Sequence, residues 1–244
     1  MEIERASGGI AYRCQPGDGP LVVFLPGYMS DMTGSKAEAL DAWAAATGRA
    51  YLRLDYSGCG ASGGDFDQGS IGRWAADALA VIDAVTDGPV VLVGSSMGGW
   101  IALRIALARP AQVAGLVGIA AAPDFTEWGL PLDDADRAAL AAQGFVVRPS
   151  AYGDTPYRYT AAFLNDAPAQ LVLGSEIAVE CPVRLLHGQA DADVPWSVAL
   201  DLAARLRSAD VQVTLVKDGD HRLSRPADLA LLTRTLDDLI EELP

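Results

Sequence analysis

The sequence has few of the residues that would indicate a metal site, disulfide bonds or a membrane anchor. It contains two histidines and three cysteines, Cys14, Cys59 and Cys181, whose spacing fits no metal-ligand motif. Because the cysteines are odd in number, we expect reduced thiols in a reducing compartment. No apolar run approaches the ~18 residues that a membrane-spanning helix needs. We therefore expect no metal, no cofactor and no membrane span.

Basic residues are also scarce relative to acidic ones. The 244 residues include 18 Lys and Arg against 32 Asp and Glu, which gives a net charge of −14 at pH 7. This charge repels phosphates and anionic membrane surfaces, so nucleic acid is not an expected partner. The N-terminus has neither the apolar core of a secretory signal nor the Arg-rich composition of a transit peptide. The sequence therefore predicts a cytoplasmic protein that acts on small molecules or on exposed protein adducts.

The pattern of apolar residues is typical of a single α/β domain over residues 1–244. Short apolar runs alternate with segments of helical spacing, which predicts a mostly parallel central sheet with helices on both faces. We expect strands at residues 21–25, 51–54, 90–93, 113–120, 183–186 and 211–217. Apolar stripes predict helices over residues 71–85 and 229–243. Another helix is expected to begin with a capping box of Ser35 and Glu38 and to end at Gly48.

The alternation of strands and helices is interrupted between residues 121 and 177. This segment contains an acidic patch, several prolines and seven aromatic residues, namely Phe125, Trp128, Phe145, Tyr152, Tyr157, Tyr159 and Phe163. A ring-rich insertion over the active edge of a sheet is typical of a lid. We expect some of the rings to pack within the insertion and others, Trp128 and Tyr157 among them, to face the substrate.

The pentapeptide G-S-S-M-G at residues 94–98 lies between an expected strand and an expected helix. A serine at such a sharp turn projects its hydroxyl above the sheet, and the flanking glycines relieve crowding. Ser96 is therefore the candidate nucleophile. Residues 60–64 also spell G-x-S-x-G around Ser62, but they lead into G-D-F-D rather than into an amphipathic helix, and we expect Ser62 to be a loop residue.

A serine nucleophile needs a base and an acid that orients the base. His221 follows the last expected strand and is the candidate base, whereas His187 ends an apolar strand and is expected to bind backbone. Asp191, Asp193 and Asp124 are candidates for the acid. The chain order of serine, acid and histidine is that of α/β-hydrolases and not of chymotrypsin or subtilisin.

An oxyanion hole needs backbone N–H groups directed at the developing negative charge. The expected donors are Met97, which follows the nucleophile at a helix N-terminus, and Tyr28, which follows Gly27 in the loop after the strand at 21–25.

Several motifs resemble those of a known family. The loop D-Y-S-G-C-G-A-S at residues 55–62 resembles the D-x-x-G-x-G-x-S loop of α/β-hydrolases. Residues 27–37, 94–100, 184–196 and 220–222 resemble the abhydrolase subfamily of mycophenolic acid acyl-glucuronide esterase, also described as a palmitoyl-protein thioesterase. The resemblance implies Ser96 as nucleophile, Asp191 as acid and His221 as base. It is weakest over residues 121–177, and from the N-terminal composition we expect no mitochondrial leader like that of the animal members.

The resemblance implies a cofactor-free serine hydrolase that cleaves esters or thioesters through an acyl-enzyme. An acyl-glucuronide substrate would require a cation for the sugar carboxylate, and the basic residues of the insertion are Arg137, Arg148 and Arg158. A long acyl chain would instead require an apolar groove, for which the aromatic residues provide a lining. The alternatives are a non-catalytic small-molecule receptor on the same fold and another reaction of the same triad, such as perhydrolysis.

Overall fold

Six parallel strands account for the six apolar runs of the sequence. The computed structural model describes residues 2–150 and 155–243. In this part of the chain an eight-stranded sheet has the order β1-β2-β4-β3-β5-β6-β9-β10. Its strands are β1 Glu4–Arg5, β2 Ala11–Gln15, β3 Asp18–Leu25, β4 Arg49–Leu54, β5 Val90–Ser95, β6 Val113–Ile119, β9 Val183–Gly188 and β10 Val211–Val216. The pairings from β4 to β10 are parallel, whereas β2 runs antiparallel to both of its neighbours. The mostly parallel α/β sheet is confirmed, and β1 and β2 are additions that the sequence did not indicate.

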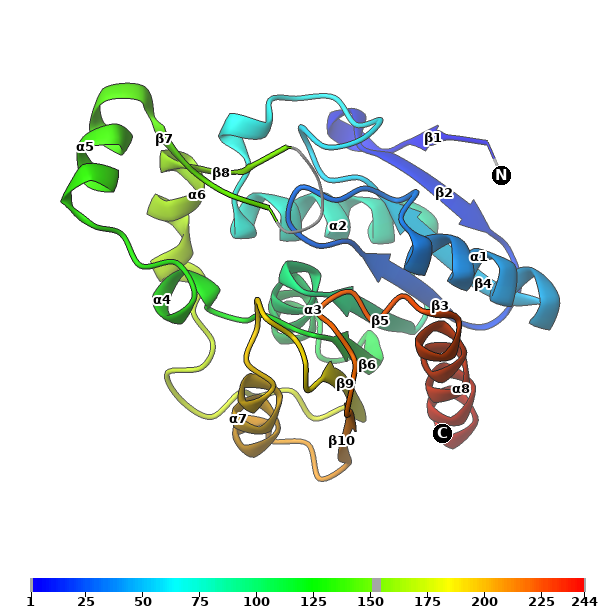
Figure 1. Ribbon diagram of the computed structural model, residues 1–244. Helices are drawn as coiled ribbons and strands as arrows, with labels where there is room; N and C mark the ends of the chain where they lie inside the picture. Colours follow the sequence, from blue (N-terminus) through cyan, green and yellow to red (C-terminus); the bar gives the residue numbers. More distant parts are fainter. Residues whose placement is uncertain (1, 151–154, 244) are drawn as a thin grey trace.

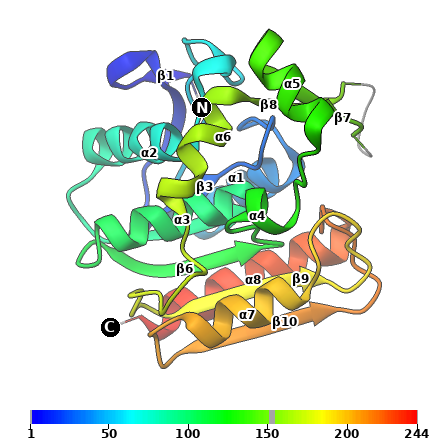
Figure 2. The same cartoon turned by 90° about the vertical axis from the view of Figure 1, so that its left-hand side faces the viewer.

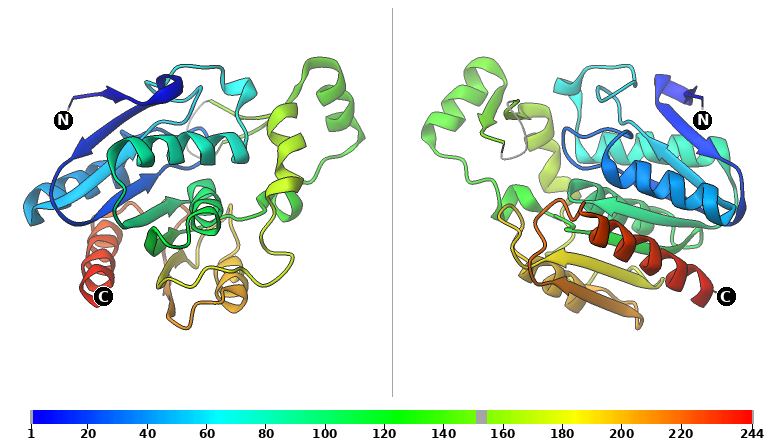
Figure 3. Two further views of the ribbon diagram at one scale, coloured as in Figure 1. Left: turned by 180° about the vertical axis from the view of Figure 1, so that it is seen from behind. Right: turned by 45° about the vertical axis from the view of Figure 1, so that its right-hand side comes forward.

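Helices cover both faces of the sheet. One face carries α1 Ser35–Thr47 and α8 Pro226–Glu242, and the other carries α2 Ile71–Val85, α3 Met97–Ala108 and α7 Ser197–Arg205 (Figures 2 and 3). Residues of β3 alternate between the two cores, because successive side chains of a strand point to opposite faces. Val22 and Phe24 pack with α1 and α8, whereas Val23 and Leu25 pack on the side of α2 and α3. Both expected apolar stripes face the sheet.

The start of α1 differs from the expected capping box. Gly34 is the N-cap, and the helix has no side-chain cap hydrogen bond at this end. The Glu38 carboxylate pairs instead with the guanidinium of Arg53, which is 1% exposed and needs a counter-charge when it is buried. The capping-box prediction was therefore wrong because a tertiary ion pair takes the carboxylate. The end of the helix is as expected: Gly48 has φ 71° and its N–H donates to the carbonyl of Ala44.

Residues 121–177 connect β6 to β9, two neighbouring strands of the sheet. The connection contains α4 Phe125–Trp128, α5 Asp134–Gln143, β7 Phe145–Arg148, β8 Tyr157–Thr160 and α6 Ala161–Asp166, followed by the short 3-10 helix η3 Ala167–Gln170. Strands β7 and β8 form a separate antiparallel pair. Figure 1 shows this segment beyond the end of the sheet to which the arrow of β3 points, which is the carboxyl edge. Tyr152 lies outside the described residues.

Two negative expectations can be compared with the structure. Cys14, Cys59 and Cys181 are free, so the expected reduced thiols agree with the structure. Over residues 2–150 and 155–243, none of the helices combines the length and apolar character that crossing a membrane requires.

Candidate active site

Ser96 lies at the sharp turn between β5 and α3. Its backbone has φ 55° and ψ −119°, a left-handed conformation that a non-glycine residue rarely adopts and that is costly unless its surroundings enforce it. The flanking glycines make the turn possible. A Cβ on Gly94 would lie 2.3 Å from the Gly98 carbonyl oxygen, and one on Gly98 would lie 2.0 Å from the carbonyl oxygen of Leu25. Backbone packing alone therefore requires glycine at both positions and presents the Ser96 side chain at the carboxyl edge of the sheet.

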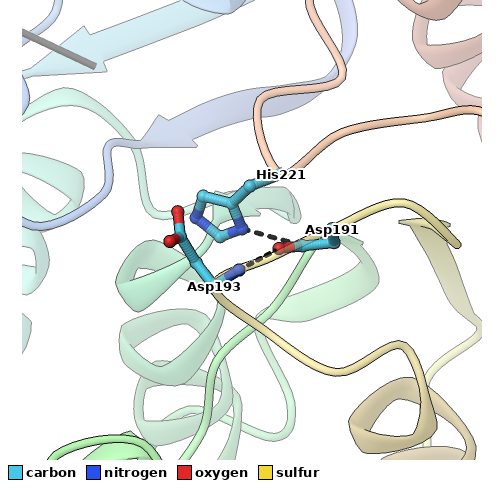
Figure 4. A group of neighbouring side chains, drawn as sticks. All are labelled: Asp191, Asp193 and His221. Carbon is cyan, nitrogen blue, oxygen red and sulfur yellow. Dashed lines mark hydrogen bonds and ion pairs between the residues drawn. The ribbon is translucent and has the colours of Figure 1, made fainter. Parts of the chain in front are cut away.

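His221 lies in the loop between β10 and α8 and contacts Ser96. The imidazole Nε2 is 3.1 Å from the Ser96 Oγ, and the Nδ1 is 2.8 Å from the Oδ2 of Asp191. Asp191 lies in the loop after β9, so the three side chains come from three different strand ends. Figure 4 shows the bond between the Asp191 carboxylate and the His221 ring. A serine, an imidazole and a carboxylate are thus joined in one chain of hydrogen bonds.

The Asp191 carboxylate is held from all sides. Its side chain is 0% exposed. Oδ1 accepts from the backbone N–H groups of Asp193 and Val194 at 2.9 and 2.8 Å, and Oδ2 also lies 3.2 Å from the His187 Nε2. Burial by itself raises the pKa of Asp191, but the hydrogen bonds from His187, His221 and the Val194 N–H outweigh burial and hold this pKa well below its usual range. Asp191 is therefore ionised over the whole pH range in which a histidine can act as a base.

The other two candidate acids make different contacts. The Asp193 carboxylate lies on the opposite side of the His221 ring from Asp191 (Figure 4), and the dashed contact of this residue is from its backbone N–H to Asp191. The buried Asp124 carboxylate accepts from the N–H groups of Val172 and Leu173 at 2.7 to 3.0 Å. Asp124 therefore ties α4 to the chain after η3. Asp191 is therefore the candidate acid whose carboxylate bonds the Nδ1 of His221.

His187 has one expected contact and one that sequence reasoning missed. Its Nε2 lies 3.0 Å from the Val194 carbonyl oxygen, which is the predicted bond to backbone. The same nitrogen reaches Asp191, four residues later, so the ring spans the turn that carries the acid. The sequence signal for this contact was the spacing of a histidine at the end of an apolar strand and an aspartate four residues later.

The two expected oxyanion donors flank the turn at Ser96. Met97 is the first residue of α3, so its N–H has no partner within the helix. Tyr28 follows Gly27, whose Cβ position lies 3.4 Å from the Cβ of Ser96. Among the described residues, neither the Tyr28 nor the Met97 N–H donates to a backbone carbonyl. Both N–H groups are thus unused beside the serine.

Asp55 organises the loop of Tyr28 and was not singled out in the sequence. Its Oδ1 accepts from the Met32 N–H and its Oδ2 from the Ala61 N–H, both at 2.7 Å. Burial raises the pKa of Asp55, and these N–H bonds oppose the rise. Ser62 lies in the loop after β4, which begins at Asp55: its Oγ donates to the Asp55 carbonyl at 2.6 Å and accepts from the Ala11 N–H at 2.7 Å. The second G-x-S-x-G therefore serves the loop's own hydrogen bonding.

A cavity of about 830 Å³ opens onto Ser96 and His221. One wall is aromatic and consists of Phe125, Trp128, Tyr157 and Tyr159, and another wall includes the cationic residues Lys36 and Arg222. Trp128 and Tyr157, two of the expected substrate contacts, thus line the cavity. The aromatic wall comes entirely from residues 121–177, and burial raises the pKa of both tyrosines, so they remain neutral phenols at physiological pH. This segment also lines the cavity with the polar residues Arg148, Ser150 and Thr155.

The arginines of residues 121–177 are engaged in contacts of their own. The Arg158 guanidinium pairs with Asp67 of the 3-10 helix η2 Phe66–Gln68, with its Nε 2.8 Å from Oδ1, and lies 3.5 Å from the centre of the Phe145 ring. Arg158 is not among the residues that line the described cavity. Arg148 lines it but pairs with Asp136 at 2.6 Å, and Arg137 donates to the Leu132 carbonyl. A carboxylate clamp built from these side chains would have to break existing contacts.

Within residues 2–150 and 155–243, the side chains that come nearest to a metal site are those of Asp191, Asp193 and His221, whose ligand atoms lie within 4.8 Å of one another. A carboxylate offers about four lone-pair sites. Asp191 already accepts from two backbone N–H groups and two imidazoles. This set therefore fits a hydrogen-bonded carboxylate better than a metal ligand, and the expectation of no metal stays an expectation.

A doubly covered, mostly parallel sheet with a serine, histidine and aspartate joined at its carboxyl edge defines the α/β-hydrolase class. A sequence profile described as the alpha/beta hydrolase family matches residues 22–232, and the chain belongs to this family. It is 43% identical over 238 residues to mouse palmitoyl-protein thioesterase ABHD10, mitochondrial, covering 96% of this chain and 80% of that protein. The human protein of the same name is 41% identical over 96% of this chain and 77% of its own length. The solved structure of mouse alpha/beta hydrolase domain-containing protein 10 superposes with a TM-score of 0.90 at 40% identity, covering 99% of this chain and 98% of that one.

These comparisons confirm the resemblance to this family and correct the expected location. The relatives that are 41–43% identical are named as mitochondrial proteins, which overturns the cytoplasmic expectation. That expectation rested on the composition of the N-terminus, and neither the fold nor the site of a hydrolase encodes its compartment.

Proposed function

We propose that this protein is a serine hydrolase that cleaves carboxylic thioesters or esters through an acyl-enzyme intermediate. The observation that carries the proposal is the hydrogen-bonded chain from the Ser96 Oγ through His221 to Asp191, with distances of 3.1 and 2.8 Å. The names of the relatives, palmitoyl-protein thioesterases, support hydrolysis of an acylated substrate.

In the proposed mechanism, the Ser96 Oγ attacks the acyl carbonyl while the His221 Nε2 takes its proton. Asp191 holds the imidazole with its proton on Nδ1 and stabilises the imidazolium that forms. The negative charge that develops on the carbonyl oxygen is directed at the N–H groups of Tyr28 and Met97, and losing one such donor typically costs about 10²- to 10³-fold in rate. The protonated His221 then donates to the leaving alcohol or thiolate. Water, activated by the same histidine, cleaves the acyl-enzyme in the second half of the cycle.

Residues 121–177 act in this proposal as a lid of the single domain, and they choose the acyl group. The aromatic wall of Phe125, Trp128, Tyr157 and Tyr159 faces the cavity next to Ser96. A volume of about 830 Å³ lies within the range of pockets that bury a drug-sized ligand. An apolar acyl chain gains roughly 0.8 kcal/mol for each methylene that it buries, so the wall favours medium and long chains over acetyl. An S-acylated protein or a small-molecule ester with such a chain is the proposed substrate.

The proposal is tested by hydrolysis of matched acetyl, octanoyl and hexadecanoyl thioesters and oxygen esters by the wild-type protein and Ser96→Ala. We expect kcat/KM to rise with chain length in the wild type and turnover to disappear in Ser96→Ala. Ser62→Ala is the matched control, since this serine also lies in a G-x-S-x-G sequence, and its turnover should be retained in any protein that folds. Turnover by Ser96→Ala equal to that of the wild type would refute the proposed nucleophile.

A further inference from the structure

The Tyr28 side chain connects the oxyanion loop to the lid. Its hydroxyl donates to the Arg158 carbonyl oxygen at 2.5 Å, and the Arg158 N–H in turn reaches the Met29 sulfur at 3.4 Å. Two consecutive residues of the loop are therefore bonded to the backbone of one residue in β8. Burial raises the pKa of Tyr28 far above physiological pH, so the phenol keeps the proton that it donates to this carbonyl. The loop that carries a proposed oxyanion donor is thus attached to the lid by hydrogen bonds on both sides of Arg158.

The Tyr28 ring also packs against the aromatic wall. It stacks on Tyr159 with ring centres 4.9 Å apart and planes 19° from parallel, and it meets the rings of Phe163 and Phe125 edge-on at 5.1 and 6.3 Å. Tyr159 and Phe125 line the cavity next to Ser96. A group that fills the cavity therefore presses on rings that touch the Tyr28 side chain directly.

The backbone on the other side of Tyr28 is strained. Met29 has φ 53°, which is a left-handed conformation of a non-glycine residue, and its side chain is 38% exposed. Such conformations persist only where neighbouring contacts enforce them. On the preceding side, Gly27 lies against Ser96. The orientation of the Tyr28 N–H therefore depends on the contacts that hold this loop, which include the bonds to the lid at Arg158 as well as the bond from the Met32 N–H to Asp55.

We propose that the Tyr28 phenol is a positioning residue that couples filling of the acyl cavity to the geometry of the oxyanion hole. An acyl chain packed against Tyr159 and Phe125 fixes β8 in place, and the hydroxyl bond to Arg158 transmits this order to the Tyr28 backbone. The inference rests on the proposed function. Binding energy from the distant part of the acyl chain then stabilises the transition state, so the length of the acyl chain affects kcat as well as KM.

The test compares kcat and KM of the wild type and Tyr28→Phe for butanoyl, octanoyl and hexadecanoyl thioesters of the same small thiol. Phenylalanine keeps the ring contacts and loses the hydrogen bond. We expect kcat of the wild type to rise with acyl-chain length, and Tyr28→Phe to lose roughly 3- to 10-fold in kcat with the hexadecanoyl substrate and clearly less with the butanoyl substrate. The KM values should keep their order. Tyr51→Phe is the matched control, because its buried hydroxyl bonds the Ala37 carbonyl at 3.0 Å within the core.

The outcomes separate this inference from the proposed function. An equal loss at every chain length, a change in KM alone or no change at all would overturn the coupling. Wild-type protein that hydrolyses none of the three thioesters would refute the proposed function instead. Met29→Leu, which removes the sulfur acceptor but keeps a similar volume, provides a second variant if Tyr28→Phe does not fold. We expect it to reduce the chain-length effect in kcat in the same direction, and an unchanged effect would count against the coupling.

Discussion

Replacing Asp191 with asparagine tests the hydrogen-bonded chain at its buried end. The Oδ1 of Asp191 accepts from two backbone N–H groups, at 2.9 and 2.8 Å, whereas Oδ2 accepts from His221 and His187. An asparagine keeps both backbone bonds only if its oxygen takes the place of Oδ1. Its NH₂ group then faces the Nδ1 of His221. Because two donors repel each other, the imidazole must carry its proton on Nε2, which can no longer accept the proton of Ser96.

The expected magnitude follows from this change of tautomer. In serine proteases, replacing the triad aspartate with asparagine holds the imidazole in the wrong tautomer and lowers kcat by about 10⁴-fold. Stability should also fall, because the second N–H of the amide then faces the His187 Nε2, which already donates to the Val194 carbonyl, and an unsatisfied buried donor costs about 1–3 kcal/mol. The two effects are separable, since the first appears in kcat of folded protein and the second in the free energy of unfolding.

The assay measures kcat for the hexadecanoyl thioester and the urea unfolding curve for Asp191→Asn. The exposed Asp201 of α7 provides the matched control, and Asp201→Asn should leave both quantities unchanged. Asp193→Asn and Asp124→Asn keep the bond between Asp191 and His221, so each should lose far less kcat than Asp191→Asn. A kcat of Asp191→Asn within about tenfold of wild type would refute the assigned role of this carboxylate.

Two further predictions concern Lys36, which lines the cavity, and Gly98 in the turn at Ser96. Burial, together with the nearby charge of Arg222, lowers the pKa of Lys36 from 10.5 to about 8. Since the pKa of Lys36 is lower in the folded state, the unfolded chain binds more protons between pH 8 and 10.5. The stability of the wild type relative to Lys36→Met should therefore rise through this window by roughly 1–3 kcal/mol. Urea unfolding of both proteins at the two ends of the window measures this rise, and a stability difference that does not change with pH would contradict the assigned burial. Gly98→Ala places a Cβ 2.0 Å from the Leu25 carbonyl oxygen and should lower the free energy of unfolding by about 3 kcal/mol or more, whereas Gly174→Ala, with nothing within 4 Å, should be tolerated. Equal unfolding midpoints for the two alanine variants would show that the turn at Ser96 can relax.

The strands and the sharp turn at Ser96 were predictable because their signals are local. Each apolar run became a strand, and the turn at Ser96 follows from glycines within a few residues of it. The choice among the acids could not be made from residue types alone, since Asp191 and Asp193 are two residues apart in one loop. What separates them is the direction of the side chain, which is set by the N–H groups of Asp193 and Val194.

Contacts between distant segments account for most of what the sequence could not predict. The guanidinium of Arg158 is taken by Asp67, which is 91 residues away in the chain. The Tyr28 phenol binds β8 at a separation of 130 residues. Glu38 pairs with Arg53 instead of capping its helix. In each case a partner that is brought close only by folding decides what a polar side chain does, and local spacing contains no information about it.

The measurement that tests the central claim most directly is the intact mass of the protein after reaction with a fluorophosphonate. The reagent forms a covalent adduct only with a serine that a neighbouring base activates. We predict a single adduct on the wild type and on Ser62→Ala, and none on Ser96→Ala. An adduct that persists in Ser96→Ala, or a wild-type protein that turns over thioesters without forming any adduct, would contradict a mechanism that proceeds through Ser96.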